Sequence, residues 1–249
     1  MTMWRGCWRR WTNWRRRSET MKAFSCFVTG TDTEIGKTLI SSALLYVLGQ
    51  AGVRAAGMKP LAAGAELRDG TWHNEDVDQL HDAAPLKLPR ELTTPYLLRT
   101  PAAPHIAAAQ ECVLIEPRHI IASYERVRAQ AEAVVVEGVG GWRVPLTHGY
   151  DTSDLARQLG LPVILVVGLR LGCINHALLT AEAIASRGLK LAGWVANTVD
   201  PAMGHMDGNI EAIAARISAP LLGHVPRLEH PTAAAAAAYL DLGKVKIDV

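Results

Sequence analysis

The amino-acid sequence predicts one α/β domain built on a single doubly wound, mostly parallel sheet flanked by helices. From Lys22 onward, short apolar runs alternate with amphipathic segments, which is the pattern of parallel strands joined by helices. The length of 249 residues suits one such domain, and no apolar run approaches the roughly 18 residues that a membrane span needs. The composition, 49% hydrophobic and 20% charged, is that of a soluble globular protein and excludes a disordered or collagen-like chain.

The predicted strands are short and apolar, as expected for strands that are buried on both faces of a sheet. They are expected at residues 24–29, 54–58, 133–136, 162–168, 191–197 and 221–225. The first helix is expected because Ile40, Leu44 and Leu48 recur at helical spacing, and it ends before Gly52. Further helices are expected at residues 116–130, 178–186 and 206–217. Residues 61–104 are expected to form loop with one short helix near residues 76–83.

A run of six alanines at residues 233–238 follows the last predicted strand. Alanine has the highest helix propensity of all residues, so we expect this run to be helical. Because the alanine side chain has little to bury, we expect a terminal helix that lies on the surface.

The formal net charge of +2 is unevenly distributed along the chain. Residues 1–20 hold six arginines, one acid and four of the seven tryptophans. Without them the chain has 20 basic and 23 acidic residues, a net charge of −3. Such a leader could be a membrane-surface helix or a targeting segment. Because the first strand-like pattern begins only at Lys22, we favour a third interpretation. In it Met21 is the natural start, residues 1–20 lie outside the fold, and the domain spans residues 21–249.

The four cysteines and nine histidines show no metal-binding or disulfide pattern. The cysteines are scattered with no C-x-x-C pair, and the histidines lack the spacing of zinc ligands. We therefore expect neither a disulfide framework nor a zinc site, and a reduced, cytoplasmic setting. The mildly acidic body gives no reason to expect a nucleic-acid or membrane partner.

The segment that carries chemistry lies between the first predicted strand and the first helix. It reads Gly30-Thr31-Asp32-Thr33-Glu34-Ile35-Gly36-Lys37-Thr38. A loop that ends in Gly-Lys-Thr at a helix N-terminus offers backbone N–H groups to phosphate oxygens, a lysine to the β and γ phosphates, and a hydroxyl to Mg²⁺. The spacing departs from the usual motif by one residue, which leaves Thr31 where the first glycine is expected. A chance turn is the alternative, but strand, loop and helix follow in the order that a P-loop needs.

A P-loop also needs an acidic side chain at the end of a neighbouring strand to position its cation. Glu137 ends the predicted strand at residues 133–136 and is followed by three glycines within four residues, which allow the backbone to approach a ligand. Asp76 and Asp78 are further candidates for this role. The alternative for these acids is solvation at a turn or at a helix start.

Two more polar residues end predicted strands at the same edge of the sheet. Lys59 follows the strand at residues 54–58 and could neutralise charge on a transferred phosphoryl group. Asn197 ends the strand at residues 191–197 and could read a base edge through its amide. A solvated lysine and a turn asparagine are the alternative interpretations.

Taken together, these segments resemble the dethiobiotin synthetase family of P-loop proteins. The resemblance rests on residues 27–38, 56–60, 136–142, 162–168, 171–177 and 192–197, and it extends from about residue 24 to residue 226. It implies an ATP- and Mg²⁺-dependent, homodimeric ligase of biotin biosynthesis. Such a ligase carboxylates 7,8-diaminononanoate with CO₂ or bicarbonate and phosphorylates the carbamate to a carbamic-phosphoric anhydride. It then closes the ureido ring and yields dethiobiotin, ADP and phosphate.

The resemblance also implies roles for individual residues. Lys37 would hold the β and γ phosphates, and Thr33 and Lys59 would contact the carbamate and the transferred phosphoryl group. Thr38, Asp76 and Glu137 would bind Mg²⁺. The nucleotide would be lined by Glu34, Ile35, Gly36, Lys37, Thr38, Leu39, Glu137, Gly138, Val139 and Gly140, and its adenine side would be held by Asn197, Thr198, Val225, Pro226 and Arg227. Residues 150–157 of the partner subunit would supply a helix N-terminus for the substrate carboxylate.

Two positions depart from the family pattern. Ala63 stands where a serine that contacts substrate is usual, so we expect substrate binding to be weaker by one hydrogen bond. Thr198 follows Asn197 where aspartate is common, which weakens the expectation of a strict preference for ATP.

Two other classes of protein share the loop. A partitioning or division-site ATPase would have the same fold, but these proteins carry a signature lysine early in the P-loop, where this chain has Asp32. An amide-forming ligase of cobalamin synthesis would need an additional glutamine-hydrolysing domain with a nucleophilic cysteine, for which 249 residues leave no room. A ligase of biotin biosynthesis is therefore the expected function.

Overall fold

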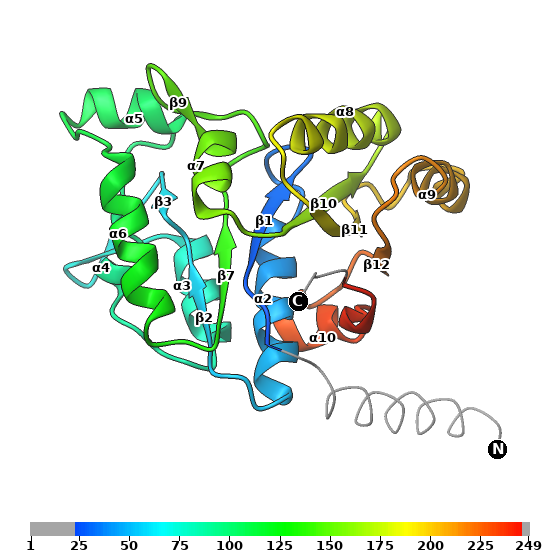
Figure 1. The fold of residues 1–249 in the computed structure, drawn as a ribbon, viewed down its shortest axis with the longest axis horizontal. Helices are drawn as coiled ribbons and strands as arrows, with labels where there is room; N and C mark the ends of the chain where they lie inside the picture. Colours follow the sequence, from blue (N-terminus) through cyan, green and yellow to red (C-terminus); the bar gives the residue numbers. More distant parts are fainter. Residues whose placement is uncertain (1–22, 246–249) are drawn as a thin grey trace.

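The computed structural model describes residues 23–245, and the leader at residues 1–20 lies outside the described residues. Its centre is a sheet of six strands that all pair in parallel, as predicted (Figure 1). The strands are β1 (Cys26–Gly30), β2 (Ala55–Met58), β7 (Ala133–Glu137), β10 (Val163–Leu169), β11 (Leu191–Thr198) and β12 (Leu221–Val225). Their order across the sheet is β12-β11-β10-β1-β7-β2, so β1 lies in the interior.

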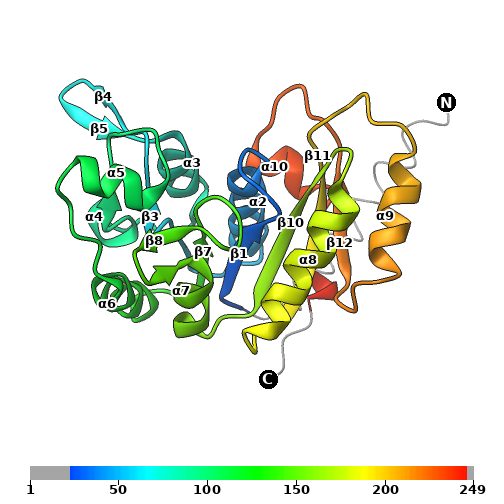
Figure 2. The ribbon, with the colours of Figure 1, turned by 90° about the horizontal axis from the view of Figure 1, so that it is seen from above.

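Helices cover both faces of the sheet, because alternate residues of each strand point to opposite sides. In β1, Val28 belongs to the core under α2 (Lys37–Gln50), α3 (Glu75–Ala83) and α10 (Ala233–Ala237), whereas Phe27 belongs to the core under α6 (Pro117–Arg128) and α7 (Thr152–Leu159). In β10, Leu165 packs under α8 (Cys173–Ser186) and α9 (Met206–Ala214). Figure 2 shows the sheet between these two helix layers.

The prediction that residues 61–104 form loop around one short helix was only partly right. The short helix is α3, but the segment also holds five further elements and leads into a sixth. These are β3 (Leu61–Ala62), β4 (Glu66–Arg68), β5 (Thr71–His73), α4 (Arg90–Thr93), β6 (Tyr96–Leu97) and α5 (Pro104–Gln110). Strands of two or three residues are too short to show a periodicity of two in the sequence, which is why they were missed.

Two shorter features complete the fold. The hairpin β8 (Pro145–Thr147) and β9 (Tyr150–Asp151) precedes α7. Helix α8 begins at Cys173, five residues before the predicted start at residue 178, because Gly172 with φ of 91° turns the chain directly from β10 into the helix. Within residues 23–245, no helix has both the length and the apolar character needed to cross a bilayer.

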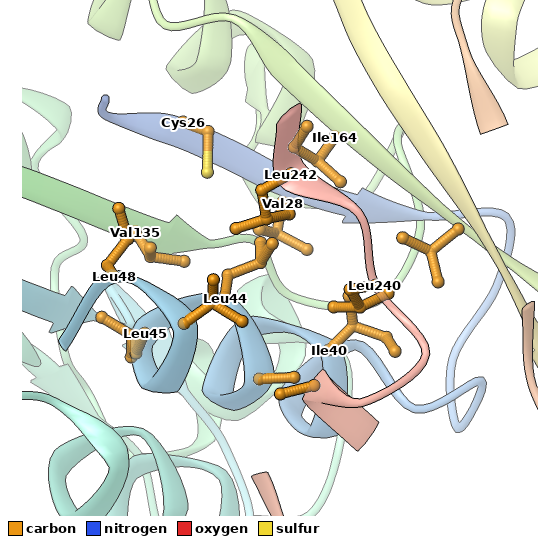
Figure 3. Close-up of a cluster of buried hydrophobic side chains, with 14 of the residues drawn as sticks. Cys26, Val28, Ile40, Leu44, Leu45, Leu48, Val135, Ile164, Leu240 and Leu242 are labelled. Carbon is orange, nitrogen blue, oxygen red and sulfur yellow. The ribbon is translucent and has the colours of Figure 1, made fainter. Parts of the chain in front are cut away.

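The helix predicted at residues 233–238 is present and partly exposed, but the expectation that it has little to bury was wrong. Helix α10 packs against α2, and Ala236 and Ala237 are fully or almost fully buried. The chain then continues into the short 3-10 helix η1 (Leu242–Lys244). Figure 3 shows Leu240 and Leu242 in one cluster with side chains of α2 and β1. Small alanine side chains let two helices approach closely, so a run with little area per residue can still close a core.

We expect the C-terminal segment to be as sensitive to overpacking as the sheet itself. A Cβ on Gly223 of β12 would lie 2.0 Å from the carbonyl oxygen of Tyr239, which is backbone and cannot swing away. Gly223→Ala should therefore lower the free energy of unfolding by about 2 kcal/mol, measured by urea denaturation. Gly208→Ala in α9, where an added Cβ meets nothing within 4 Å, is the matched control and should be neutral or stabilising. Equal effects of the two changes would contradict this packing.

Candidate active site

A large cavity of about 1060 Å³ lies at the carboxyl edge of the parallel sheet, where α/β proteins commonly bind ligands. It brings together fifteen of the residues that the sequence predicted. These are Thr33, Glu34, Gly36, Lys37, Thr38, Leu39, Lys59, Ala63, Asp76, Val139, Gly140, Asn197, Thr198, Pro226 and Arg227.

Four predicted lining residues lie beneath the surface of this cavity, and their contacts with a nucleotide stay predictions. Ile35, Glu137, Gly138 and Val225 are buried below its surface. Ile35 and Val225 belong to the hydrophobic core, and Gly138 packs against Phe27. Sequence motifs mark contiguous stretches, but alternate residues of a stretch face opposite ways, so only part of each stretch reaches the ligand space.

The loop before α2 has the backbone geometry of a phosphate cradle. Glu34 has φ of 56° and Gly36 has φ of 84°, so the chain twists through left-handed conformations as it enters the helix. Asn197 fixes this turn, because its Nδ2 donates a hydrogen bond of 2.8 Å to the carbonyl oxygen of Ile35. A Cβ on Gly36 would lie 2.4 Å from that same Nδ2, so glycine is required here for space as well as for φ. The proposed base contact of Asn197 would therefore use its Oδ1.

Lys37 begins α2 and is held within the loop. Its Nζ donates a 2.8 Å hydrogen bond to the carbonyl oxygen of Asp32. Burial, together with the positive charge of Lys59, lowers the pKa of Lys37 from 10.5 to about 8. A phosphate group would reverse that shift, so the lysine is set up to bind an anion.

Four polar side chains from different elements converge next to Lys37. The Nζ of Lys59 lies 2.5 Å from Oε1 of Glu137 and 2.9 Å from Oδ2 of Asp76. Thr38 Oγ1 lies 2.9 Å from Oε1 of Glu137 and 2.7 Å from Oδ1 of Asp76. Residues that stand 99 positions apart in the sequence thus share one network.

Electrostatics keeps the Lys59 and Asp76 side chains charged. Burial lowers the pKa of Lys59, but the negative charges of Glu137 and Asp76 outweigh it, and the pKa is raised. Burial raises the pKa of Asp76, but Lys59 and the Thr38 hydroxyl outweigh it, and the pKa is lowered. A buried ammonium and a carboxylate with fixed charges are suited to phosphoryl-transfer chemistry.

The same network could hold a hard cation. Thr38, Asp76 and Glu137 offer only oxygen atoms, the ligand type that Mg²⁺ prefers. Glu137 Oε2 is buried and has no hydrogen-bond partner among the described residues, which is costly unless a cation or another donor joins it. Within residues 23–245, no cluster of three or more His, Cys, Asp or Glu could hold a metal alone, so ligand oxygens would have to complete the shell.

Asp78, the second predicted acid of α3, does not join this network. Its carboxylate lies 2.6 Å from Arg90 and 2.9 Å from His73 Nδ1. The residue at position 76 faces the cavity and the residue at position 78 faces the neighbouring loop, because two positions along a helix differ by about 200° in direction. Asp78 therefore anchors the helix that carries Asp76.

The sequence did not single out several other residues that line the cavity. Arg143 is one of them, and its Nε donates a 2.5 Å hydrogen bond to Asp151. Asn74 is another, and its Nδ2 donates to the carbonyl oxygen of Ala63 at 3.0 Å. Neither stands at a predicted strand end. The remaining ones are Ala62, Glu75, Gln79, Pro101, Ala102, Ala103, Pro104, Val144, Pro145, Val199, Leu228, Glu229 and Pro231.

The carboxylate site expected at residues 150–157 involves a partner subunit and stays a prediction. This segment includes the start of α7, where the Asp151 carboxylate accepts hydrogen bonds from the N–H groups of Ser153 and Asp154. A substrate carboxylate would have to compete with Asp151 for these N–H groups.

We expect the lowered pKa of Lys37 to appear in the pH dependence of stability. Between pH 8 and 10.5 the unfolded chain keeps a proton that folded Lys37 releases, so the free energy of unfolding rises with pH in this window. The difference in free energy of unfolding between the wild type and Lys37→Met should therefore grow by as much as about 3 kcal/mol across this pH window. Urea unfolding without ligands measures it. Lys244→Met, at an exposed lysine of η1, is the control. Parallel pH profiles for wild type and Lys37→Met would contradict the shift.

Comparison with known proteins identifies the family. A family model described as an AAA domain matches residues 25–235. ATP-dependent dethiobiotin synthetase BioD of Janthinobacterium sp. (strain Marseille) is 64% identical over 222 residues, which is 88% of this chain and 94% of the relative. The enzyme with the same name from Aromatoleum aromaticum is 59% identical over 216 residues, which is 87% of this chain and 96% of that relative.

Solved structures resemble the chain in fold alone. The septum site-determining protein MinD of Pyrococcus horikoshii OT3, complexed with Mg-ADP, superposes with a TM-score of 0.53 at 17% identity, covering 88% of this chain and 94% of that one. A ParA family ATPase from Chlorobium tepidum TLS gives a TM-score of 0.51 at 14% identity, covering 88% and 92%. The partitioning and division-site class thus shares the architecture at low identity, whereas the close relatives are ligases. The chain belongs to the ATP-dependent dethiobiotin synthetase family.

Proposed function

We propose that this protein is an ATP-dependent dethiobiotin synthetase, a cyclo-ligase that forms C–N bonds. It would convert 7,8-diaminononanoate, CO₂ and ATP into dethiobiotin, ADP and phosphate. The observation that carries the proposal is the meeting of Lys37, Lys59, Thr38, Asp76 and Glu137 at one phosphate-binding loop, in a chain 64% identical to a named relative.

The proposed reaction consists of three steps. One amine of the substrate attacks CO₂ and loses a proton, which forms a carbamate. A carbamate oxygen then attacks the γ-phosphorus of ATP and expels ADP, which forms a carbamic-phosphoric anhydride. The second amine attacks the carbonyl carbon, loses a proton and expels phosphate, which closes the ureido ring. The protein supplies position and charge for these steps rather than a covalent group of its own.

Charge neutralisation is the proposed role of the two buried lysines. Lys37 would bind the β and γ phosphates, since it begins the helix that follows the loop. Lys59 would face the transferred phosphoryl group from the side opposite to Lys37. Its ammonium lies 2.5 Å from Glu137, and its raised pKa keeps it charged. Thr33 lines the same cavity and would contact the carbamate. Preorganised charges of this kind lower the barrier without reorganising during the reaction.

Mg²⁺ is the cation that we propose for the oxygen cluster. Thr38, Asp76 and Glu137 would hold it, and the unpartnered Oε2 of Glu137 supports this assignment. When bound, Mg²⁺ neutralises charge on the phosphate oxygens and orients them.

The adenine base of the nucleotide would lie near the ends of β11 and β12. Asn197, Thr198, Pro226 and Arg227 line this part of the cavity. Thr198 Oγ1 is 2.9 Å from His224 Nε2, so the side chain that replaces the usual aspartate already has a polar partner. Preference for ATP over other triphosphates, homodimer formation and a cytoplasmic setting stay predictions.

Release of phosphate that depends jointly on three substrates tests the function. Phosphate should appear only when 7,8-diaminononanoate, bicarbonate and ATP are all present, with dethiobiotin as product by mass spectrometry. Lys37→Ala should lower kcat/KM by at least about 100-fold, because removal of one such positioned charge typically costs that much. Lys244→Ala is the matched control at an exposed lysine outside the site. ATP hydrolysis that is indifferent to the diamine would overturn the proposal.

Restoring the missing hydroxyl at position 63 should strengthen substrate binding. Ala63 lines the cavity, and its carbonyl oxygen is fixed by Asn74. Ala63→Ser should lower the KM for the diamine by about 2- to 10-fold while the KM for ATP stays unchanged, because one added hydrogen bond is worth about 0.5–1.5 kcal/mol. An unchanged diamine KM would show that position 63 does not contact substrate.

A further inference from the structure

Arg170 forms an ion pair with a residue of the phosphate-binding loop. The proposed mechanism does not use this ion pair. Arg170 follows directly after β10, and its guanidinium contacts the carboxylate of Asp32. The two side chains are 44% and 43% exposed. Neither of them lines the cavity, so any effect on a bound nucleotide must act through the loop or through the electric field.

The ion pair is the third in a series of contacts between β10 and the start of the loop. The N–H of Thr31 donates a 3.0 Å hydrogen bond to the carbonyl oxygen of Val166, and the N–H of Gly168 donates to Thr31 Oγ1 at 3.4 Å. Arg170 follows two residues later and contacts Asp32. Residues 166 and 168 thus both contact Thr31, and residue 170 contacts Asp32, the next residue of the loop.

Asp32 itself is an integral part of the loop. Its Oδ1 accepts a 2.8 Å hydrogen bond from the N–H of Thr33, and its carbonyl oxygen accepts one from Lys37 Nζ at the same distance. The carboxylate therefore lies close to the ammonium that would bind the terminal phosphates. A negative charge at this place opposes the binding of an anion.

The charges of the neighbouring network do not offset Asp32. Lys37 and Lys59 carry two positive charges, and Asp76 and Glu137 carry two negative charges when ionised, so these four balance one another. Within the loop itself Asp32 and Glu34 are acidic and only Lys37 is basic, so the acids are in excess. Arg170 is the cation that contacts Asp32 and neutralises that carboxylate.

We propose that Arg170 is a positioning residue for nucleotide binding, because it neutralises Asp32 and thereby allows an acidic side chain to shape the loop without repelling the triphosphate. This inference rests on the proposed use of ATP at this site. It makes Asp32 a structural acid whose charge is compensated from the neighbouring strand. The charge would then act on the phosphates that Lys37 binds, and ATP, which has a γ-phosphate, would feel it more than ADP.

Calorimetric titration of the full chain with ATP and with ADP, in the absence of the diamine, tests this inference. Arg170→Gln should raise the Kd for ATP about tenfold at low salt and the Kd for ADP less, because the uncompensated charge acts on the terminal phosphate. The added change Asp32→Asn should bring the Kd for ATP back to within about twofold of the wild type, since asparagine still accepts the Thr33 N–H. The effect of Arg170→Gln should shrink as ionic strength rises.

Turnover gives a second readout. Arg170→Gln should raise the KM for ATP with kcat within about twofold, because the residue touches neither the substrate nor the reacting atoms. Arg118→Gln, at an exposed arginine that pairs with Glu116, is the matched control and should change neither constant. Equal losses for ATP and ADP that Asp32→Asn fails to restore, or no loss at all, would overturn the inference while leaving the proposed function intact. A wild type that binds no ATP would overturn both.

Discussion

The placement of Lys59 between Glu137 and Asp76 is the interaction on which the rest of this site depends. Burying the Glu137 carboxylate or the Lys59 ammonium alone would cost several kcal/mol, and each is tolerated because the other compensates it. Asp76, which is about half exposed, adds a second carboxylate to the pair. Lys59 follows β2, Asp76 belongs to α3 and Glu137 ends β7, so the requirement for charge balance fixes the relative positions of three elements. The Thr38 hydroxyl adds α2 to the same network. Folding of the domain and assembly of the site are therefore one process.

The phosphate-binding loop is shaped by β10 and β11, which lie on one side of β1, and not by its own residues alone. The carbonyl oxygen of Val166 in β10 accepts a hydrogen bond from the N–H of Thr31, and Asn197 of β11 donates one to the carbonyl oxygen of Ile35. The tight fit of Gly36 against the Asn197 amide shows that the loop and β11 are complementary in shape. A loop held in this way presents its N–H groups without the entropic cost of ordering them when an anion binds.

The C-terminal segment supports the site from behind. Helix α2 begins with Lys37 and Thr38, and its other faces pack against the sheet and against α10. Leu240 and Leu242 complete the cluster that surrounds α2. The helix whose N-terminus points at the phosphate site is thus buried along most of its length, which restricts its movement relative to the sheet. The segment of lowest sequence complexity contributes to the rigidity of the site.

The sequence alone determined the parallel α/β fold, the phosphate-binding loop and the family, because apolar periodicity and the Gly36-Lys37-Thr38 motif are local patterns. It also placed Lys59 and Glu137 at the edge where the structure has them, since the ends of parallel strands meet there, whereas Asp76 was assigned through the family resemblance. Only the tertiary structure decided which residues face the cavity, that Asp78 turns away, that α10 buries Ala236 and Ala237 against α2, and that Arg170 contacts Asp32. These outcomes depend on side-chain direction and on contacts between distant segments. A one-dimensional pattern does not encode either of them, because burial is settled by the neighbour that a residue meets and not by its own identity.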